Sequence, residues 1–267
     1  GGVLGIRRPY NFIKGETPIF FKSGKGSRVI DVDGNEFLDM LCAYGPIIIG
    51  YREEEIDNAV IEQIKNNGVC FSLTHPVHNE LSETLKKYIP CCETSVFLKT
   101  GSDATSAAIR AARCYTGKDK ILRCGYHGWH DWCVESKGGV PKKNYEDILE
   151  FKYNDLNSLE KTVKEGGDNI AAIILTPIHH PLGYKVEFPN NNFLGEVREI
   201  CNINNIVLIF DEIRTGFRVN MGGAQKIFGV TPDLACFGKA VANGYPISIL
   251  AGKKDVMGSY EKKAFLS

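Results

Sequence analysis

Short apolar runs alternate with amphipathic stretches over most of the chain from residue 95 onward. Runs of strand length occur at residues 95–100, 120–124, 170–176, 206–212 and 234–239. Apolar positions recur every three or four residues over 102–117, 154–166 and 191–205, which predicts helices there. Strands that are apolar throughout and alternate with helices are typical of a mainly parallel sheet buried on both faces. The pattern therefore predicts an α/β fold with helices on both faces of a central sheet.

The first part of the chain follows a different pattern. Residues 19–40 predict β structure, in which SGKG and DVDGNEF form hairpin turns because glycine readily adopts a positive φ. Helices are predicted over 53–66, ending at Asn67-Gly68, and over 76–88. We expect this N-terminal β structure to be separate from the parallel sheet.

Charge and composition exclude several classes of protein. The 32 basic and 32 acidic residues balance, so the chain lacks the basic field of a nucleic-acid or membrane-surface protein. The longest uncharged apolar stretches, near 170–175 and 240–252, are shorter than the roughly 18 residues that a membrane helix needs. None of the nine cysteines forms a CxxC pair, several lie in apolar runs, and no signal peptide is visible, which predicts a reducing, cytoplasmic location.

Candidate chemistry lies where the predicted strands end, because open α/β sheets bind ligands outside the carboxyl ends of their strands. At Thr100-Gly101-Ser102 a strand meets a helix, where free backbone N–H groups and the helix dipole favour an anion such as phosphate. The alternative is a capped helix with Ser102 as N-cap and nothing bound. The segment is neither a Walker A loop nor a GxGxxG motif.

An aromatic and histidine cluster, CGYHGWHDW, follows the strand at 120–124. Tyr126 or His127 can stack on a planar ligand. A zinc site built from His127, His130, Cys124 and Cys133 is a second interpretation, but the spacing matches no standard zinc site, so we expect no metal. A packed aromatic loop is the third.

Charged side chains end the next two strands. Asp211 and Glu212 follow a very apolar strand, where a carboxylate needs a partner: Arg214 or Arg218, a cationic ring nitrogen of a ligand, or a metal. Lys239 ends the apolar strand at 234–239 and is either a surface lysine or a desolvated, nucleophilic amine.

One ligand has a chemical group that suits the residues at each of these strand ends. Pyridoxal 5′-phosphate (PLP) has a phosphate for Gly101 and Ser102, a flat ring for Tyr126 or His127, a basic ring nitrogen for Asp211 and an aldehyde for Lys239. Asp211 keeps the ring nitrogen protonated, and Lys239 binds the aldehyde as an imine and later moves the substrate proton.

The ordered motifs resemble those of the class III, fold-type I, PLP-dependent aminotransferases, and especially the glutamate-1-semialdehyde 2,1-aminomutase subgroup. They span nearly the whole chain: GGVLGIRRPY, DVDGNEFLDM, YGPIIIGY, TGSDATSAAIRAAR, GYHGW, DEIRTGFR and TPDLACFGKAVANGYPI. The resemblance implies the fold-type I sheet, residues 1–50 as part of a small domain, and residues 51–267 as an incomplete large PLP-binding domain. It also implies an absent C-terminal domain and a homodimer with active sites at its interface.

By the same resemblance, each site residue has an implied role. Lys239 forms the Schiff base and Asp211 faces the pyridine nitrogen. The other implied contacts are the phosphate ligands Gly101 and Ser102, Tyr126 stacked on the ring with His127 beside it, Ile213 on the opposite ring face, and Arg8 and Tyr44 on the substrate.

Two positions depart from the family pattern. Thr176-Pro177, followed by His179 and His180, stands where the family usually has Glu-Pro. Arg214 stands where Met or Gln is expected, and it either suits an acidic substrate or pairs with Glu212.

The predicted function is an aminotransferase that moves an amino group between a small-molecule donor and a keto or aldehyde acceptor. The alternatives are the intramolecular amino transfer of the aminomutase, and a non-catalytic binding protein on the same fold. An NAD-dependent oxidoreductase is disfavoured by the lack of GxGxxG. The substrate and the amino donor do not follow from the sequence.

Overall fold

The computed structural model describes residues 11–181 and 185–263, and the chain divides into two compact units, Gly1–Leu73 and Thr74–Ser267. The assignment of residues 1–50 and 51–267 to two domains of the fold stays a prediction. In the described ranges no helix is both long and apolar enough to cross a membrane.

The first unit contains a three-stranded antiparallel sheet made of β1 (Phe21–Lys25), β2 (Arg28–Asp31) and β3 (Glu36–Leu38). Gly26 and Gly34 turn the chain at φ values of 56° and 90°, as the sequence predicted. The Asp31 carboxylate accepts hydrogen bonds from the backbone of Asp33 and Asn35 and so closes the second turn. After the short helix η3 (Cys42–Tyr44), helix α1 (Glu54–Asn66) ends at the predicted Asn-Gly stop.

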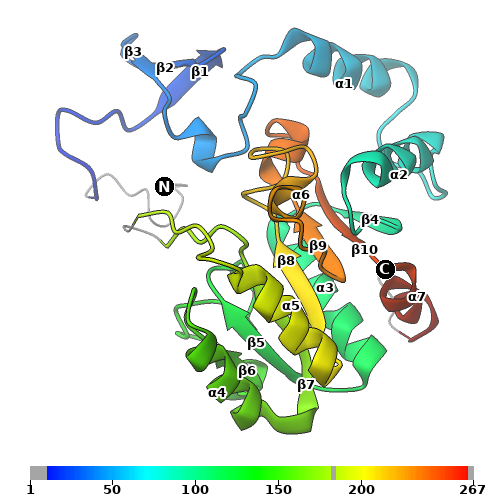
Figure 1. Ribbon diagram of the computed structural model, residues 1–267. Coiled ribbons are helices and arrows are strands. Elements are labelled where there is room, and N and C mark those ends of the chain that lie inside the picture. The colour runs from blue at the N-terminus through cyan, green and yellow to red at the C-terminus, as the bar shows by residue number, and fades with distance from the viewer. Residues whose placement is uncertain (1–10, 182–184, 264–267) are drawn as a thin grey trace. The chain divides into compact units, whose positions relative to one another are not determined.

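The second unit is built on a seven-stranded sheet (Figure 1). Its order is β4 (Thr94–Leu98), β10 (Ser248–Gly252), β9 (Leu234–Phe237), β8 (Val207–Asp211), β7 (Ile170–Leu175), β5 (Lys120–Cys124) and β6 (Ile148–Glu150). Strand β10 is antiparallel to both of its neighbours, and every other pairing in this sheet is parallel. The predicted mainly parallel sheet is confirmed.

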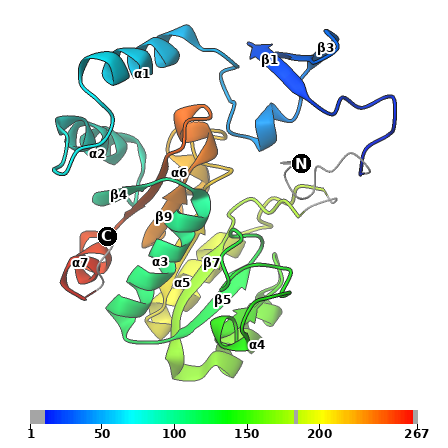
Figure 2. The same cartoon turned by 180° about the vertical axis from the view of Figure 1, so that it is seen from behind.

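Helices cover both faces of this sheet because successive strand residues point to opposite sides. In β8, Val207 and Ile209 pack in one cluster with helices α3 (Gly101–Thr116) and α7 (Lys254–Lys263). Leu208 and Phe210 pack in another with helices α4 (Leu156–Gly166) and α5 (Phe193–Asn204). Figure 1 is seen from the α5 side and Figure 2 from the α3 side. A third cluster joins helix α2 (Pro76–Tyr88) to β9 and β10.

The predicted helices and strands of this unit are present, and their ends lie within two residues of the predicted ones. The sequence missed four elements, namely β6, β10, α7 and helix α6 (Gly223–Phe228), and the short helices η4 (Lys142–Asn144) and η5 (Gly167–Asn169). One boundary affects the site. Strand β9 ends at Phe237, so Lys239 begins the short helix η6 (Lys239–Ala242) instead of ending the strand.

Candidate active site

The predicted site residues of the second unit gather at one edge of the large sheet. The carboxyl ends of β4, β5, β8 and β9 lie at this edge, because these strands run in the same direction. The last residue of β8, Asp211, and the segments that follow these strands carry the residues that the sequence singled out: Gly101, Ser102, Tyr126, His127, Asp211, Ile213 and Lys239. The fold therefore brings together side chains that are up to 138 positions apart, from Gly101 to Lys239 (239 − 101).

Helix α3 begins with a capping box that leaves two N–H groups without partners. Thr100 is the N-cap: its hydroxyl accepts from the Asp103 N–H at 3.2 Å, and the Asp103 carboxylate accepts from the Thr100 N–H at 2.8 Å. The alternative with Ser102 as N-cap is therefore wrong. The Asp103 and Ala104 N–H groups also reach the Thr100 carbonyl, whereas those of Gly101 and Ser102 have no acceptor among the described residues.

Two glycines bring other segments close to this helix start. A Cβ on Gly101 would lie 2.7 Å from the Ile213 Cδ1 atom, and a Cβ on Gly128 would lie 2.5 Å from the Ser102 Oγ atom. The Ser102 hydroxyl accepts from the Trp129 N–H at 3.3 Å, so its own hydrogen remains free to donate. Two backbone donors, one hydroxyl donor and the positive end of the helix dipole thus form a cradle for an anion.

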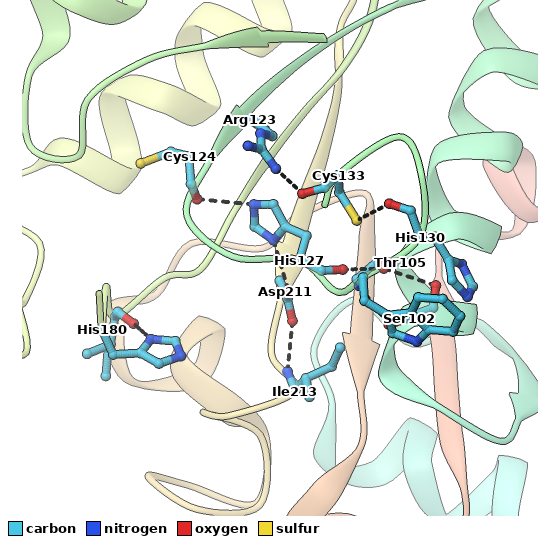
Figure 3. A network of polar contacts seen from close by, with 12 residues as sticks. Ser102, Thr105, Arg123, Cys124, His127, His130, Cys133, His180, Asp211 and Ile213 are labelled. Atoms are coloured by element: carbon cyan, nitrogen blue, oxygen red, sulfur yellow. Dashed lines mark hydrogen bonds and ion pairs between the residues drawn. The ribbon is translucent and has the colours of Figure 1, made fainter. Parts of the chain in front are cut away.

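His127 and Asp211 form a buried pair (Figure 3). The His127 Nδ1 atom lies 2.8 Å from the Asp211 Oδ2 atom, and the Nε2 atom lies 3.1 Å from the Cys124 carbonyl oxygen. Its ring is stacked on Trp132. Both ring nitrogens of His127 therefore lie within hydrogen-bond distance of an oxygen atom, one from Asp211 and one from the Cys124 backbone. His127 is 1% exposed and Tyr126 is 45% exposed, so only the Tyr126 ring is open to a planar ligand.

The two carboxylates after β8 point to different surroundings. The second oxygen of Asp211 accepts from the Ile213 N–H at 3.2 Å. The Glu212 side chain is fully buried and accepts from the Thr215 hydroxyl and from the backbone N–H groups of Ala224 and Gln225. Burial raises the pKa of Glu212, and these hydrogen bonds oppose the rise. Glu212 therefore anchors the loop to α6, and the expectation that it pairs with Arg214 is wrong.

Lys239 has the properties of a reactive amine. Its backbone adopts a φ of 46°, a strained value for a residue with a side chain. The amine is half-buried and has no hydrogen bond or ion pair with the described part of the chain. Burial, and then the charge of Arg214, lower the pKa of Lys239 to about 8, while Asp211 acts in the opposite direction.

A cleft of about 480 Å³ has Tyr126, Thr176, His180 and Arg214 in its wall. Neither Asp211 nor Glu212 has an arginine partner within 11–181 and 185–263. His127 and His130 do not share a site, because His130 bonds to the Ser106 hydroxyl at 2.7 Å. Over the same ranges no group of three His, Cys, Asp or Glu side chains is placed to hold a metal ion.

Two predicted substrate residues are not tested by this geometry. Arg8 lies outside the described residues, and Tyr44 lies in η3 of the first unit. The sequence analysis missed the capping box of Thr100 and Asp103 and the attachment of Glu212 to α6. The capping box had a visible signal, because TGSD fits the pattern Ser/Thr-x-x-Asp/Glu. Glu212 had none, because its partners come from a helix that the pattern did not predict.

Comparison with known proteins agrees with this site. Residues 11–264 match the family model "Aminotransferase class-III". The chain is 63% identical over all of its 267 residues to a 3-aminobutyryl-CoA aminotransferase of Cloacimonas acidaminovorans, and 37% identical to a glutamate-1-semialdehyde 2,1-aminomutase of Natranaerobius thermophilus. It spans 64% of the first relative and 62% of the second.

Solved structures give the same result. The FumI protein of Sphingopyxis sp. MTA144, in its PLP internal aldimine form, superposes with a TM-score of 0.94 at 32% identity, covering 100% of this chain and 64% of that one. An omega-transaminase of Sphaerobacter thermophilus superposes with a TM-score of 0.84 at 31% identity, covering 92% of this chain and 60% of that one. The predicted fold-type I architecture is confirmed.

Proposed function

The chain belongs to the class-III aminotransferases, and we propose from this that it forms the cofactor-binding part of an enzyme that transfers an amino group. The donor is a small-molecule amine and the acceptor is a ketone or aldehyde. The observation that supports this most strongly is the free, half-buried amine of Lys239 at the same sheet edge as the buried Asp211.

The site fits PLP at each of its polar ends. The free N–H groups of Gly101 and Ser102, with the Ser102 hydroxyl, suit the phosphate. The accessible Tyr126 ring suits one face of the pyridine, and Ile213, packed against the start of α3, suits the other. These assignments, like those of Arg8 and Tyr44, are part of the proposal.

Asp211 and His127 would control the charge at the pyridine nitrogen. PLP, when bound, accepts the electrons released as a bond to the substrate carbon breaks. The Asp211 carboxylate would hold the proton on the ring nitrogen, and His127 would hold that carboxylate in place through the 2.8 Å contact between its Nδ1 atom and the Asp211 Oδ2 atom. His127 is in turn oriented by the Cys124 carbonyl and by Trp132.

Lys239 would act twice. Its Nζ atom would hold the cofactor through the aldehyde carbon, with the aldehyde oxygen leaving as water, and a lowered pKa favours this because only the neutral amine is nucleophilic. With the substrate amine bound in its place, the released Nζ atom would move the proton at the substrate carbon.

For the substrate, we propose a β-amino acyl thioester of the 3-aminobutyryl-CoA kind, supported by 63% identity over the whole chain to a relative of that name. Intramolecular transfer, as in the aminomutases, is the second candidate, since those relatives reach 39% identity. Thr176 and Arg214 distinguish the site from the aminomutase pattern and favour the first candidate. We also propose that the whole protein works as a homodimer in the cytoplasm.

The half-reaction tests this function. The complete protein, loaded with PLP, is mixed with amino donors while the absorbance of the lysine-bound cofactor is followed. We expect that band to disappear as the aminated cofactor forms, and Lys239→Ala to abolish the change. Borohydride reduction and peptide mapping should then find the pyridoxyl group on Lys239. A protein that binds PLP but gives no change with any donor is a binding protein, and the proposal is then wrong.

A further inference from the structure

Arg214 is an unpartnered cation in the wall of the cleft. It follows Ile213 in the loop after β8, is half-buried, and has no hydrogen bond or ion pair through its guanidinium with the described residues. A guanidinium that has lost part of its hydration is normally paired with an oxygen acceptor, since it carries five donors and no acceptor. The structure therefore leaves a set of donors facing the cleft.

None of the acidic groups near Arg214 is its partner among the described residues: three are engaged elsewhere, and Glu135, which also lines the cleft, is exposed and makes no ion pair with it. Asp211 accepts from His127 and from the Ile213 N–H, and Glu212 is turned away and held by α6. Glu150, which also lines the cleft, is paired with Arg123 at 2.5 Å. Arg218 and Lys239 add positive charge near Arg214 and near each other. The field around Arg214 consequently favours an anionic or strongly polar oxygen from outside the chain.

His180 and Thr176 do not compensate this charge. The His180 Nδ1 atom donates to the Ile178 carbonyl at 2.9 Å, which leaves the Nε2 atom as an acceptor. Burial, and then Arg214, lower the pKa of His180 to about 4, so the ring is neutral at physiological pH. Thr176 is buried and cannot carry a charge, whereas the glutamate usual at this position could pair with a cation.

We propose that Arg214 binds the acyl oxygen of the substrate, meaning the carboxylate or thioester oxygen on the carbon chain whose amino group is transferred. The site then selects amino acyl compounds over simple amines. This inference rests on the proposed function, because it assigns the cleft to the amino substrate. The free acid and the thioester both carry an oxygen acceptor on the acyl carbon. The experiment below shows which of the two forms binds.

The first test measures binding without turnover. Butyrate and butyryl-CoA have the acyl group but no amine or ketone, so they bind without reacting. Calorimetric titration of the PLP-loaded complete protein should show that Arg214→Gln weakens binding of at least one probe about 10- to 100-fold, the usual effect of losing a hydrogen bond to a charged group. Whichever probe binds identifies the acid or the thioester as the natural group.

Two further variants make this test specific. Arg110→Gln removes the same charge from an exposed position on α3 and should leave binding unchanged. Arg214→Lys retains the charge and should lose less affinity than Arg214→Gln. If neither probe binds the unmodified protein, or if Arg214→Gln binds both with unchanged affinity, Arg214 is not the acyl contact.

The second test separates this inference from the proposed function. The half-reaction is compared for 3-aminobutyryl-CoA, 3-aminobutyrate and butan-2-amine, which has the same carbon chain without the acyl oxygen. Arg214→Gln should raise KM for the acyl donor about tenfold or more relative to KM for butan-2-amine, because its effect on the Lys239 pKa is shared by all donors. Equal losses for all donors would overturn the inference while the transaminase function stands. If the unmodified protein shows no half-reaction with any donor, the proposed function is refuted. The binding test then still decides the role of Arg214.

Discussion

The pH at which Lys239 becomes nucleophilic is a direct consequence of its surroundings. The prediction concerns the cofactor-free protein when the pH is raised from 7 to 10. With a pKa of about 8 in place of 10.5, about 9% of the Lys239 side chains are neutral at pH 7, against about 0.03% of ordinary lysines. Since only the neutral amine attacks an aldehyde, Lys239 gains roughly 300-fold in reactive fraction at pH 7.

The assay is stopped-flow capture of PLP, followed by the absorbance of the lysine adduct. We expect the capture rate to rise about tenfold from pH 7 to 9 and to level off above that, whereas Nα-acetyl-lysine under the same conditions continues to rise to pH 10. Arg214→Gln should move the midpoint upward but not to 10.5, because burial is the larger cause and Arg214 the second. A midpoint of 10 or above in the unmodified protein would refute this reasoning.

The same lowered pKa of Lys239 makes the stability of the fold depend on pH. A lysine with a lowered pKa in the folded state binds its proton less well than the unfolded chain does, so folding is disfavoured below the folded pKa. The Lys239 contribution should therefore become more favourable as the pH rises from about 8 towards 10.5. In urea denaturation, Lys239→Met should remove this pH dependence, and an unchanged slope would contradict the assignment.

Three other substitutions test the anchors of the site. Glu212→Ala leaves the Ala224 and Gln225 N–H groups without their acceptor and should lower the unfolding free energy by about 2–4 kcal/mol in urea denaturation, whereas the exposed Glu199→Ala should change it little. Gly128→Ala places a Cβ 2.5 Å from the Ser102 Oγ atom and should weaken PLP binding about tenfold or more in fluorescence titration; Gly138→Ala, with open space around it, is the control, and equal affinities would contradict the cradle. Asp211→Asn should reduce the rate of the half-reaction about 100-fold or more while PLP remains bound, and a near-normal rate would remove Asp211 from the mechanism.

The sequence predicted those residues of the candidate site that stand at or next to the end of a strand. Gly101 and Ser102 stand where a strand becomes a helix, and Asp211 stands after a run of apolar residues, so each carried a signal in its immediate neighbourhood. The partners of these residues were not predictable, because they come from distant segments. His127 is 84 positions from Asp211, and its ring could equally have faced a ligand. Its burial against Trp132 and the Cys124 carbonyl decided that it faces Asp211 instead.

Local sequence patterns determined the strands, the helices and the parallel character of the sheet. Apolar runs such as residues 170–175 must be buried on both faces, and periodic helices must cover them, whatever the rest of the chain does. Tertiary structure alone decided which charges are compensated. Glu212 turned inward because Ala224 and Gln225 offered donors, which left Arg214 facing the cleft beside Lys239. Hydrogen-bond partners and local charge depend on positions in space, and a linear pattern does not carry these.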